Sequence, residues 1–166
     1  YTGWYTLSLH DALPISMAAN LLRAGIPLIV WNRNADKSKT LEAVGAQVAA
    51  SVAELFASTS IILMMLLDEQ AIDAVLERGT ARFDALVSGK TLVNLGTTSA
   101  EYSSGLELDL LRAGGHYVEA PVSGSRVPAE RGALVGMVAG DSVSVAAVMP
   151  LLEPLCAKAF KCGLVP

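Results

Sequence analysis

The sequence contains few cysteines, few aromatic residues and few charges. Its 166 residues include two cysteines, 5% aromatic residues and 17% charged residues. Cys156 and Cys162 are too few for a secreted disulfide framework, and neither lies in a pattern with metal-ligand spacing. We therefore expect reduced thiols, a cytoplasmic location and no bound metal. Because 52% of the residues are hydrophobic, disorder is excluded, and a chain of this length buries roughly 70% of its unfolded surface without crosslinks.

The sequence also lacks an excess of positive charge and a long apolar run. With 12 Lys and Arg against 16 Asp and Glu, the formal net charge is -4. Nucleic-acid phosphates require clustered Lys and Arg, and no such cluster occurs, so we expect no nucleic-acid partner. The uncharged apolar run Ile61–Leu67 is far shorter than the roughly 20 residues that cross a bilayer. It predicts a buried strand and no membrane association.

Short aliphatic runs alternate with helical patterns from Met17 onward. This alternation is typical of βαβ units and predicts an α/β fold, a Rossmann-like doubly wound domain with a mainly parallel sheet. Strands are predicted at 28–31, 47–49, 61–66, 91–95, 117–119, 134–139 and 159–162. Helices are predicted at 17–24, from Ser51, at 68–76, at 99–113 and from 141 to about 155. The Gly-, Ser- and Pro-rich segment 121–132 is predicted to be a loop, where α/β folds place ligands.

Short polar residues precede several of the predicted helices. Ser51 and Glu54 have the spacing of a capping box, in which each side chain satisfies a free backbone N–H. The other predicted N-caps are Asp68, Ser99 and Asp141. Gly25 and Gly114 follow predicted helices and are expected to end them, because glycine readily adopts the left-handed conformation.

Several motifs follow one another in a recognisable order. They are M-A-A-N-L-L at 17–22, V-W-N-R at 30–33, M-L-L-D at 65–68, N-L-G-T-T at 94–98 and E-A-P-V-S-G-S at 119–125, followed by Ala129, Gly132 and Leu134. The set resembles the β-hydroxyacid dehydrogenase family, which includes 3-hydroxyisobutyrate dehydrogenase and tartronate semialdehyde reductase and is related to 6-phosphogluconate dehydrogenase. The last motif is similar to the substrate signature D-A-P-V-S-G-G-x-x-x-A-x-x-G-x-L. The resemblance implies an NAD(P)-dependent oxidoreductase that interconverts a small 3-hydroxy acid and its semialdehyde or keto acid.

Asn32 and Arg33 follow the predicted strand 28–31, where a Rossmann fold meets the adenosine ribose of its cofactor. A carboxylate there would bind the ribose hydroxyls of NAD, and none is present. An Arg guanidinium pairs with a 2′-phosphate, so these residues favour NADP as the cofactor. The alternatives are NAD as the cofactor and a solvated Arg33 near Lys37 and Lys39.

Leu66, Leu67 and Thr97 lie just past the ends of two predicted central strands. The resemblance implies that they bind the cofactor on its nicotinamide side. Ordinary core and turn packing is the alternative interpretation for all three residues.

Ser123 and Gly124 combine a hydroxyl with a backbone that approaches an anion closely. This combination suits the carboxylate of a small hydroxy acid substrate, and the resemblance adds Ser125 to the same site. A tight turn without a ligand is the alternative interpretation.

The N-terminal segment departs from the family. Its G-x-G-x-x-G phosphate-binding turn is expected directly before Met17 and is absent. Residues 5–15, Y-T-L-S-L-H-D-A-L-P-I, resemble the translation of a short-read sequencing adapter. Residues 1–16 are therefore interpreted as a non-native segment preceding an NAD(P)-binding domain at 17–166. We expect an incomplete first βα unit, although residues 5–9 have enough β-propensity to replace the missing strand.

The catalytic residue of the family has no counterpart in this chain. The family uses a Lys as general acid and base, expected beyond Pro166 at the start of a helical domain, and neither Lys158 nor Lys161 matches it. We therefore assign no catalytic residue and predict an inactive chain. The resemblance implies that the helical domain closes the substrate cleft and makes a homo-oligomer in the full-length form. Two alternatives stay open: a non-catalytic NAD(P)-binding or assembly module, and an imine reductase-like enzyme.

Overall fold

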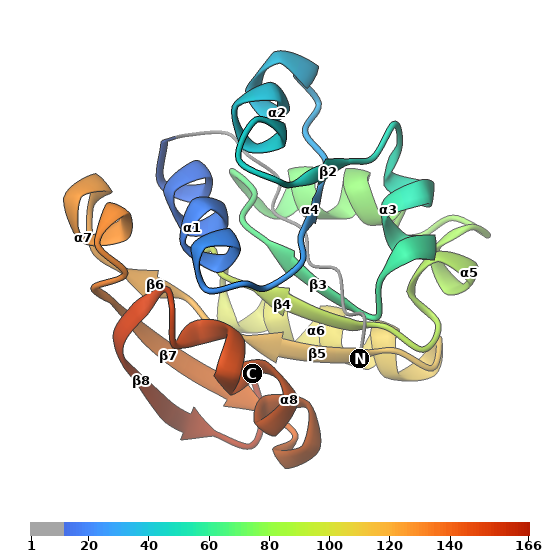
Figure 1. Ribbon diagram of the computed structural model, residues 1–166. Helices are drawn as coiled ribbons and strands as arrows, with labels where there is room; N and C mark the ends of the chain where they lie inside the picture. The colour runs from blue at the N-terminus through green and yellow to red at the C-terminus, as the bar shows by residue number, and fades with distance from the viewer. Residues whose placement is uncertain (1–11) are drawn as a thin grey trace.

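The computed structural model describes residues 12–166, in which helices alternate with strands (Figure 1). The helices are α1 (Ala12–Arg23), α2 (Ala35–Glu42), α3 (Val52–Ser58), α4 (Glu69–Leu76), α5 (Phe83–Val87), α6 (Ala100–Arg112), α7 (Arg126–Glu130) and α8 (Ser142–Leu152). The strands are β1 (Ile29–Val30), β2 (Gln47–Val48), β3 (Ile61–Met64), β4 (Thr91–Asn94), β5 (His116–Glu119), β6 (Val122–Ser123), β7 (Leu134–Gly140) and β8 (Cys156–Gly163). Within this part of the chain, no helix is long and apolar enough to cross a membrane.

The main sheet is parallel in its first part and mixed in its second. Strands β3, β4 and β5 pair in parallel, and β7 then pairs antiparallel with both β5 and β6 and parallel with β8. Strands β1 and β2 form a separate parallel pair. The predicted Rossmann-like α/β class is confirmed, with antiparallel pairings added around β7. The replacement strand predicted at 5–9 lies outside the described residues.

Alternate residues of the central strands point into two hydrophobic clusters. Leu63, Val93 and Val118 join one cluster, together with residues of α1 and α8. Their neighbours Ile62, Leu92 and Tyr117 join the other, together with residues of α3, α4, α5 and α6. Because successive side chains of a strand point to opposite faces, helices cover both faces of the sheet. This arrangement explains why β3 is continuously apolar and why Leu92 and Val93, adjacent in β4, are both apolar.

The predicted helix caps are present. Each of the four side chains accepts a hydrogen bond from a backbone N–H of the helix that it precedes, and Gly25 and Gly114 have φ angles of 77° and 78°. The capping bonds are Ser51 to Glu54 (3.1 Å), Asp68 to Ala71 (2.7 Å), Ser99 to Tyr102 (3.2 Å) and Asp141 to Val143 and Ser144 (3.0 Å each). The positions of these helix starts and ends were therefore encoded locally.

The segment 121–132 is not the simple loop that its composition predicts. It contains β6 and the short helix α7. Strand β6 forms by pairing with β7, and α7 packs beside α1, where Asn20 Nδ2 donates a 2.7 Å hydrogen bond to Ala129 O (Figure 1). These elements depend on contacts distant in sequence, which local composition does not reveal. The last strand likewise begins at Cys156, earlier than predicted, because its pairing with β7 begins there.

Helix α1 runs without a break across the expected boundary between residues 16 and 17. Leu13 and Ile15 pack against the first hydrophobic cluster, and Pro14 is buried in the first helical turn. Proline is tolerated there because the first N–H groups of a helix have no partner within it. The boundary therefore does not coincide with the end of an element, and the foreign origin of residues 1–16 stays a prediction.

Candidate functional site

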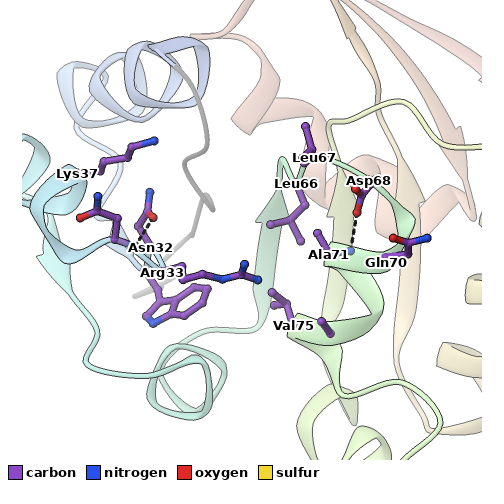
Figure 2. A pocket seen from close by; sticks show the side chains of 12 residues that line it. Asn32, Arg33, Lys37, Leu66, Leu67, Asp68, Gln70, Ala71 and Val75 are labelled. Carbon is purple, nitrogen blue, oxygen red and sulfur yellow. Dashed lines mark hydrogen bonds between the residues drawn. The ribbon is translucent and has the colours of Figure 1, made fainter.

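A cavity of about 500 Å³ lies between the segments that follow β1 and β3 (Figure 2). Its lining residues are Trp31, Asn32, Arg33, Asn34, Lys37, Leu66, Leu67, Asp68, Gln70, Ala71, Ala74 and Val75. In Figure 2 the guanidinium of Arg33 extends from the β1 side toward Val75 on α4. The carboxyl ends of strands are where open α/β sheets bind ligands. Four of the residues predicted to bind the cofactor, Asn32, Arg33, Leu66 and Leu67, lie here together.

The loop after β1 is shaped by two asparagines. Asn32 Oδ1 accepts a 2.8 Å hydrogen bond from the N–H of Asn34, and Asn34 Oδ1 accepts a 3.1 Å bond from the N–H of Asp36 at the start of α2. These bonds turn the chain sharply between the strand and the helix. Arg33 is left exposed at the edge of the cavity.

In the part of the chain that the structure describes, the acidic side chain nearest in sequence to Arg33, that of Asp36, has another partner. Asp36 pairs instead with Lys39, at 2.7 Å between Oδ1 and Nζ. The hydrogen bond and charge of Lys39 lower the pKa of Asp36, and Asp36 raises the pKa of Lys39 in turn. Among the described residues, no ion pair involves Arg33. Lys37 also lines this wall of the cavity.

A second cavity of about 340 Å³ adjoins the first and contains Thr97. Its lining residues are Leu67, Asp68, Glu69, Gln70, Thr97, Thr98 and Ser99. Leu67 is 68% exposed and lines both cavities, as do Asp68 and Gln70. The predicted cofactor residues therefore follow one continuous path, from Arg33 past Leu67 to Thr97.

Glu69 joins the two helix starts that flank the second cavity. Its Oε1 accepts hydrogen bonds from the N–H of Ser99 at 2.9 Å and from the Ser99 hydroxyl at 2.7 Å. These bonds lower the pKa of Glu69. The start of α4 is thereby held against the start of α6, which fixes the width of the cavity.

The residues predicted to bind substrate lie on the segment that contains β6. Ser123, Gly124 and Ser125 are exposed and line neither of the two cavities. Gly124 has a φ of 147°, and a Cβ there would lie 2.6 Å from Leu134 Cδ2. A positive φ of this kind is one that residues with side chains rarely adopt, which favours glycine beside Ser123. Arg126, a nearby cation, pairs with Glu130 at 2.7 Å.

Sequence reasoning missed the contribution of α4 to the larger cavity. Gln70, Ala71, Ala74 and Val75 lie on one face of this helix because their spacing matches the helical period. The predicted cap at Asp68 gave the start of the helix, so this face was a detectable signal.

The residues of the larger cavity are chemically compatible with the adenosine end of a dinucleotide. Arg33 and Lys37 provide cationic groups, no carboxylate directly follows β1, and Leu66 and Val75 provide an apolar surface for a base. The start of α1 fits less well, because its residues 12–16 contain no glycine. Among residues 12–166, no group of three or more His, Cys, Asp or Glu side chains could hold a metal ion.

Comparison with known proteins agrees with this geometry. The NAD binding domain of 6-phosphogluconate dehydrogenase matches residues 15–163. Glyoxylate/succinic semialdehyde reductase 1 from Arabidopsis thaliana is 34% identical over 151 residues, which cover 90% of this chain and 52% of the relative. The 2-hydroxy-3-oxopropionate reductase of Escherichia coli (strain K12) is 35% identical over 141 residues, which cover 84% of this chain and 47% of the relative.

The fold is shared with solved structures as well. A Streptomyces aurantiacus imine reductase superposes with a TM-score of 0.89 at 23% sequence identity, covering 99% of this chain and 56% of that one. The chain spans about half the length of the curated relatives that it matches. Its sequence, fold and cavity all indicate an NAD(P)-binding domain of the β-hydroxyacid dehydrogenase type. The chain belongs to the family of the NAD binding domain of 6-phosphogluconate dehydrogenase.

Proposed function

We propose that this domain serves an NADP-dependent oxidoreductase that interconverts a small 3-hydroxy acid and its semialdehyde or keto acid. The observation that carries the choice of NADP is Arg33, which lines the larger cavity without an acidic partner among the described residues. A guanidinium recognises a phosphate through charge-assisted hydrogen bonds, often two at once. Arg33 and Lys37 would hold the 2′-phosphate, and Asn32 would hold the adjoining ribose.

The path from the larger cavity to Thr97 supports the placement of the nicotinamide. Leu66 and Leu67 would pack along the cofactor, and Thr97 would contact it at the far end of the second cavity. When bound, the cofactor donates or accepts the hydride. The chain's own residues orient the cofactor and keep one side of it against an apolar surface.

The substrate assignment rests on the segment that contains β6. The Ser123 hydroxyl and the backbone beside Gly124 and Ser125 would bind a carboxylate. The named activities of the two reductase relatives involve small carboxylic acids, which supports this class of substrate. An imine reductase is the alternative, and its support is the shared fold. The exposed Ser-Gly-Ser turn favours an anionic substrate over an imine.

We assign no acid or base to this chain. Lys158 and Lys161 lie exposed on strand β8 and line neither of the two proposed cofactor cavities. We therefore propose that the chain binds nucleotide without catalysing a reaction. Turnover of NADPH with glyoxylate by the purified chain would contradict this proposal.

A pair of nucleotides tests the NADP assignment directly. Adenosine 2′,5′-bisphosphate and AMP differ only in the 2′-phosphate, and neither requires a pyrophosphate-binding turn. Because the sequence contains two tryptophans, a Trp4→Phe variant leaves Trp31, which lines the cavity, as the single fluorescent reporter. In this variant we expect the bisphosphate to bind at least about tenfold more tightly than AMP.

The matched variants are Arg33→Ala and Arg112→Ala, each made in the Trp4→Phe background. Arg112 is an exposed arginine of α6 that lines neither cavity. We expect Arg33→Ala to abolish the preference for the bisphosphate and Arg112→Ala to preserve it. Equal affinities for the two nucleotides, or a preference that survives Arg33→Ala, would overturn the proposal.

A further inference from the structure

A polar cluster interrupts the apolar face that α6 covers. Asn94 and Glu119 are the last residues of β4 and β5 and are direct partners in the parallel register. Ser103 is a fully buried residue of α6. It is hydrogen-bonded directly to the side chain of Glu119 and, through Thr98, to the side chain of Asn94. Elsewhere the same helix buries Leu106 and Leu110 in the second hydrophobic cluster, with Ile62 and Leu92. The polar groups are therefore confined to the strand ends where the proposed ligands bind.

The hydrogen bonds of this cluster run in one direction. Ser103 Oγ donates to Glu119 Oε1 at 2.8 Å, which uses the single hydroxyl hydrogen of Ser103. The Thr98 hydroxyl, 2.9 Å from Ser103 Oγ, must therefore donate to it. Thr98 Oγ1 accepts in turn from Asn94 Nδ2 at 3.2 Å. The chain of donors leads from Asn94 through Thr98 and Ser103 to the carboxylate of Glu119.

Tyr117 provides the third hydrogen-bond partner of the Ser103 hydroxyl. Its hydroxyl lies 3.5 Å from Ser103 Oγ, and because the hydrogen of Ser103 is donated to Glu119, Tyr117 is the donor in this contact. Ser103 then makes one donated and two accepted hydrogen bonds, which is the full capacity of a hydroxyl group. Its removal would leave the hydroxyls of the half-buried Thr98 and the buried Tyr117 without their acceptor.

The cluster connects the two loops to which we assign different ligands. On one side, Asn94 Oδ1 accepts a 3.1 Å hydrogen bond from the N–H of Gly96, next to Thr97. On the other side, Glu119 directly precedes the segment that leads to Ser123. Two backbone bonds also join the chain here, 2.8 Å from Ala120 N to Asn94 O and 3.3 Å from Val122 N to Leu95 O.

We propose that Ser103 and Glu119 are positioning residues that fix the spacing between the cofactor loop at 95–99 and the substrate loop at 120–125. The assignment of these loops rests on the proposed function, whereas their mechanical connection does not. Hydride transfer requires the two reacting carbons to be held close and aligned, so the relative position of these loops matters for the reaction.

Amide hydrogen exchange of the ligand-free chain tests the connection. We expect Ser103→Ala to accelerate exchange at both Gly96 and Val122 by about five- to tenfold, since one charge-assisted hydrogen bond is removed. Ser104→Ala is the matched control, because it makes the same change at the next residue of α6, outside the cluster. Acceleration confined to α6, or equal acceleration in both variants, would overturn the proposal.

Variants of Glu119 separate positioning from simple loss of stability. Glu119→Gln keeps an oxygen that accepts from Ser103, so we expect exchange at Gly96 and Val122 close to that of the unmodified chain. Glu119→Ala should reproduce the effect of Ser103→Ala. A Gln variant that behaves like the Ala variant would contradict the proposal.

Nucleotide binding distinguishes this inference from the proposed function. The Arg33 cavity does not include Ser103 or Glu119, so Ser103→Ala should leave the affinity for adenosine 2′,5′-bisphosphate unchanged within about twofold. Failure of the bisphosphate to bind the unmodified chain would refute the cofactor assignment and leave the exchange result standing. Unchanged exchange with normal bisphosphate binding would refute the positioning roles alone.

Discussion

Residues 29–76 and residues 116–163 build their parts of the proposed site in different ways. Around the larger cavity, the charged group of Arg33 is exposed and its loop is shaped by short hydrogen bonds of neighbouring asparagines. In residues 116–163, Gly124 and Gly132 make backbone approaches that leave no room for a side chain. Under the proposed function, ligand charge is recognised where water competes, whereas the positions of reacting groups are set by packing.

The largest effect is expected where this packing is tightest, at Gly132. Its φ is 64°, and a Cβ would lie 2.5 Å from the backbone oxygen of Pro154. We expect Gly132→Ala to lower the free energy of unfolding by about 3 kcal/mol, through strain and overlap together. Gly79 has a φ of 79° with no atom near a Cβ, so Gly79→Ala should cost about 1 kcal/mol. Urea denaturation measures the free energy of unfolding of both variants. Equal losses of stability would contradict the prediction, because they would show that the overlap at position 132 is relieved.

A smaller loss is expected at Asn20. Its side-chain amide is buried and donates to Ala129 O, which ties α1 to α7. Asn20→Ala should cost about 2 kcal/mol, because a buried carbonyl loses a hydrogen bond. Asn34→Ala, which removes an exposed cap in residues 29–76, should cost about 1 kcal/mol or less. If thermal or urea unfolding ranks these variants in the reverse order, the contrast between the two parts is wrong.

The two parts of the molecule should also differ in their response to salt. Arg33 is exposed, so raising NaCl from about 0.05 M to about 0.5 M should weaken binding of adenosine 2′,5′-bisphosphate by about fivefold. The destabilisation caused by Gly132→Ala involves no charge and should not change. Fluorescence titration and urea denaturation at both salt concentrations provide the comparison, and salt-independent binding would contradict an electrostatic role for Arg33.

The smallest effect is expected from the pH dependence of Asp141. Burial alone would raise its pKa, but hydrogen bonds from Ser144 and Val143 and the nearby His116 lower it overall. A carboxylate with a lowered folded pKa stabilises the protein above its unfolded pKa and loses this effect as pH falls through the folded pKa. Asp141→Ala should cost about 1 kcal/mol at pH 7, shrinking below about pH 4. Burial and the charge of Asp141 raise the pKa of Glu107, so both proteins are compared in a Glu107→Gln background.

Asp141→Asn is the control for this prediction. The amide oxygen still caps α8, so stability at pH 7 should be close to that of the unmodified chain. The part of the stability loss at acid pH that comes from protonation of Asp141 should be absent in this variant. Identical pH profiles for the Asn variant and the unmodified chain would assign that loss to other carboxylates.

Much of the first part of the fold was predictable because its signals are local. The caps at Ser51, Asp68 and Ser99 each involve residues within one turn of sequence, and the apolar runs at 61–64 and 91–94 fill buried parallel strands. The motif at 30–33 likewise indicated residues that line the larger cavity. The structure brings Asn32, Arg33, Leu66 and Leu67 to one cavity, as their positions at strand ends implied.

The remaining features depend on contacts that no local pattern reveals. Helix α7 is held by Asn20, more than a hundred residues earlier in the chain. The connection between Ser103 and Glu119 exists because Asn94 and Glu119 are paired in register, and neither residue signals that pairing. The composition of the segment 121–132, rich in Gly, Ser and Pro, predicted a loop and concealed the pairing of β6 with β7.

The alternation of the central strands between two hydrophobic clusters also limits how the sequence can change in length. Inserting one residue within β4 would move Leu92 to the cluster that holds Val93, and would exchange the faces of every residue that follows in the strand. A two-residue insertion would preserve the faces but shift the strand end that carries Asn94. Insertions and deletions among related domains should therefore collect in connections such as 77–82, leaving 91–94 and 116–119 constant in length.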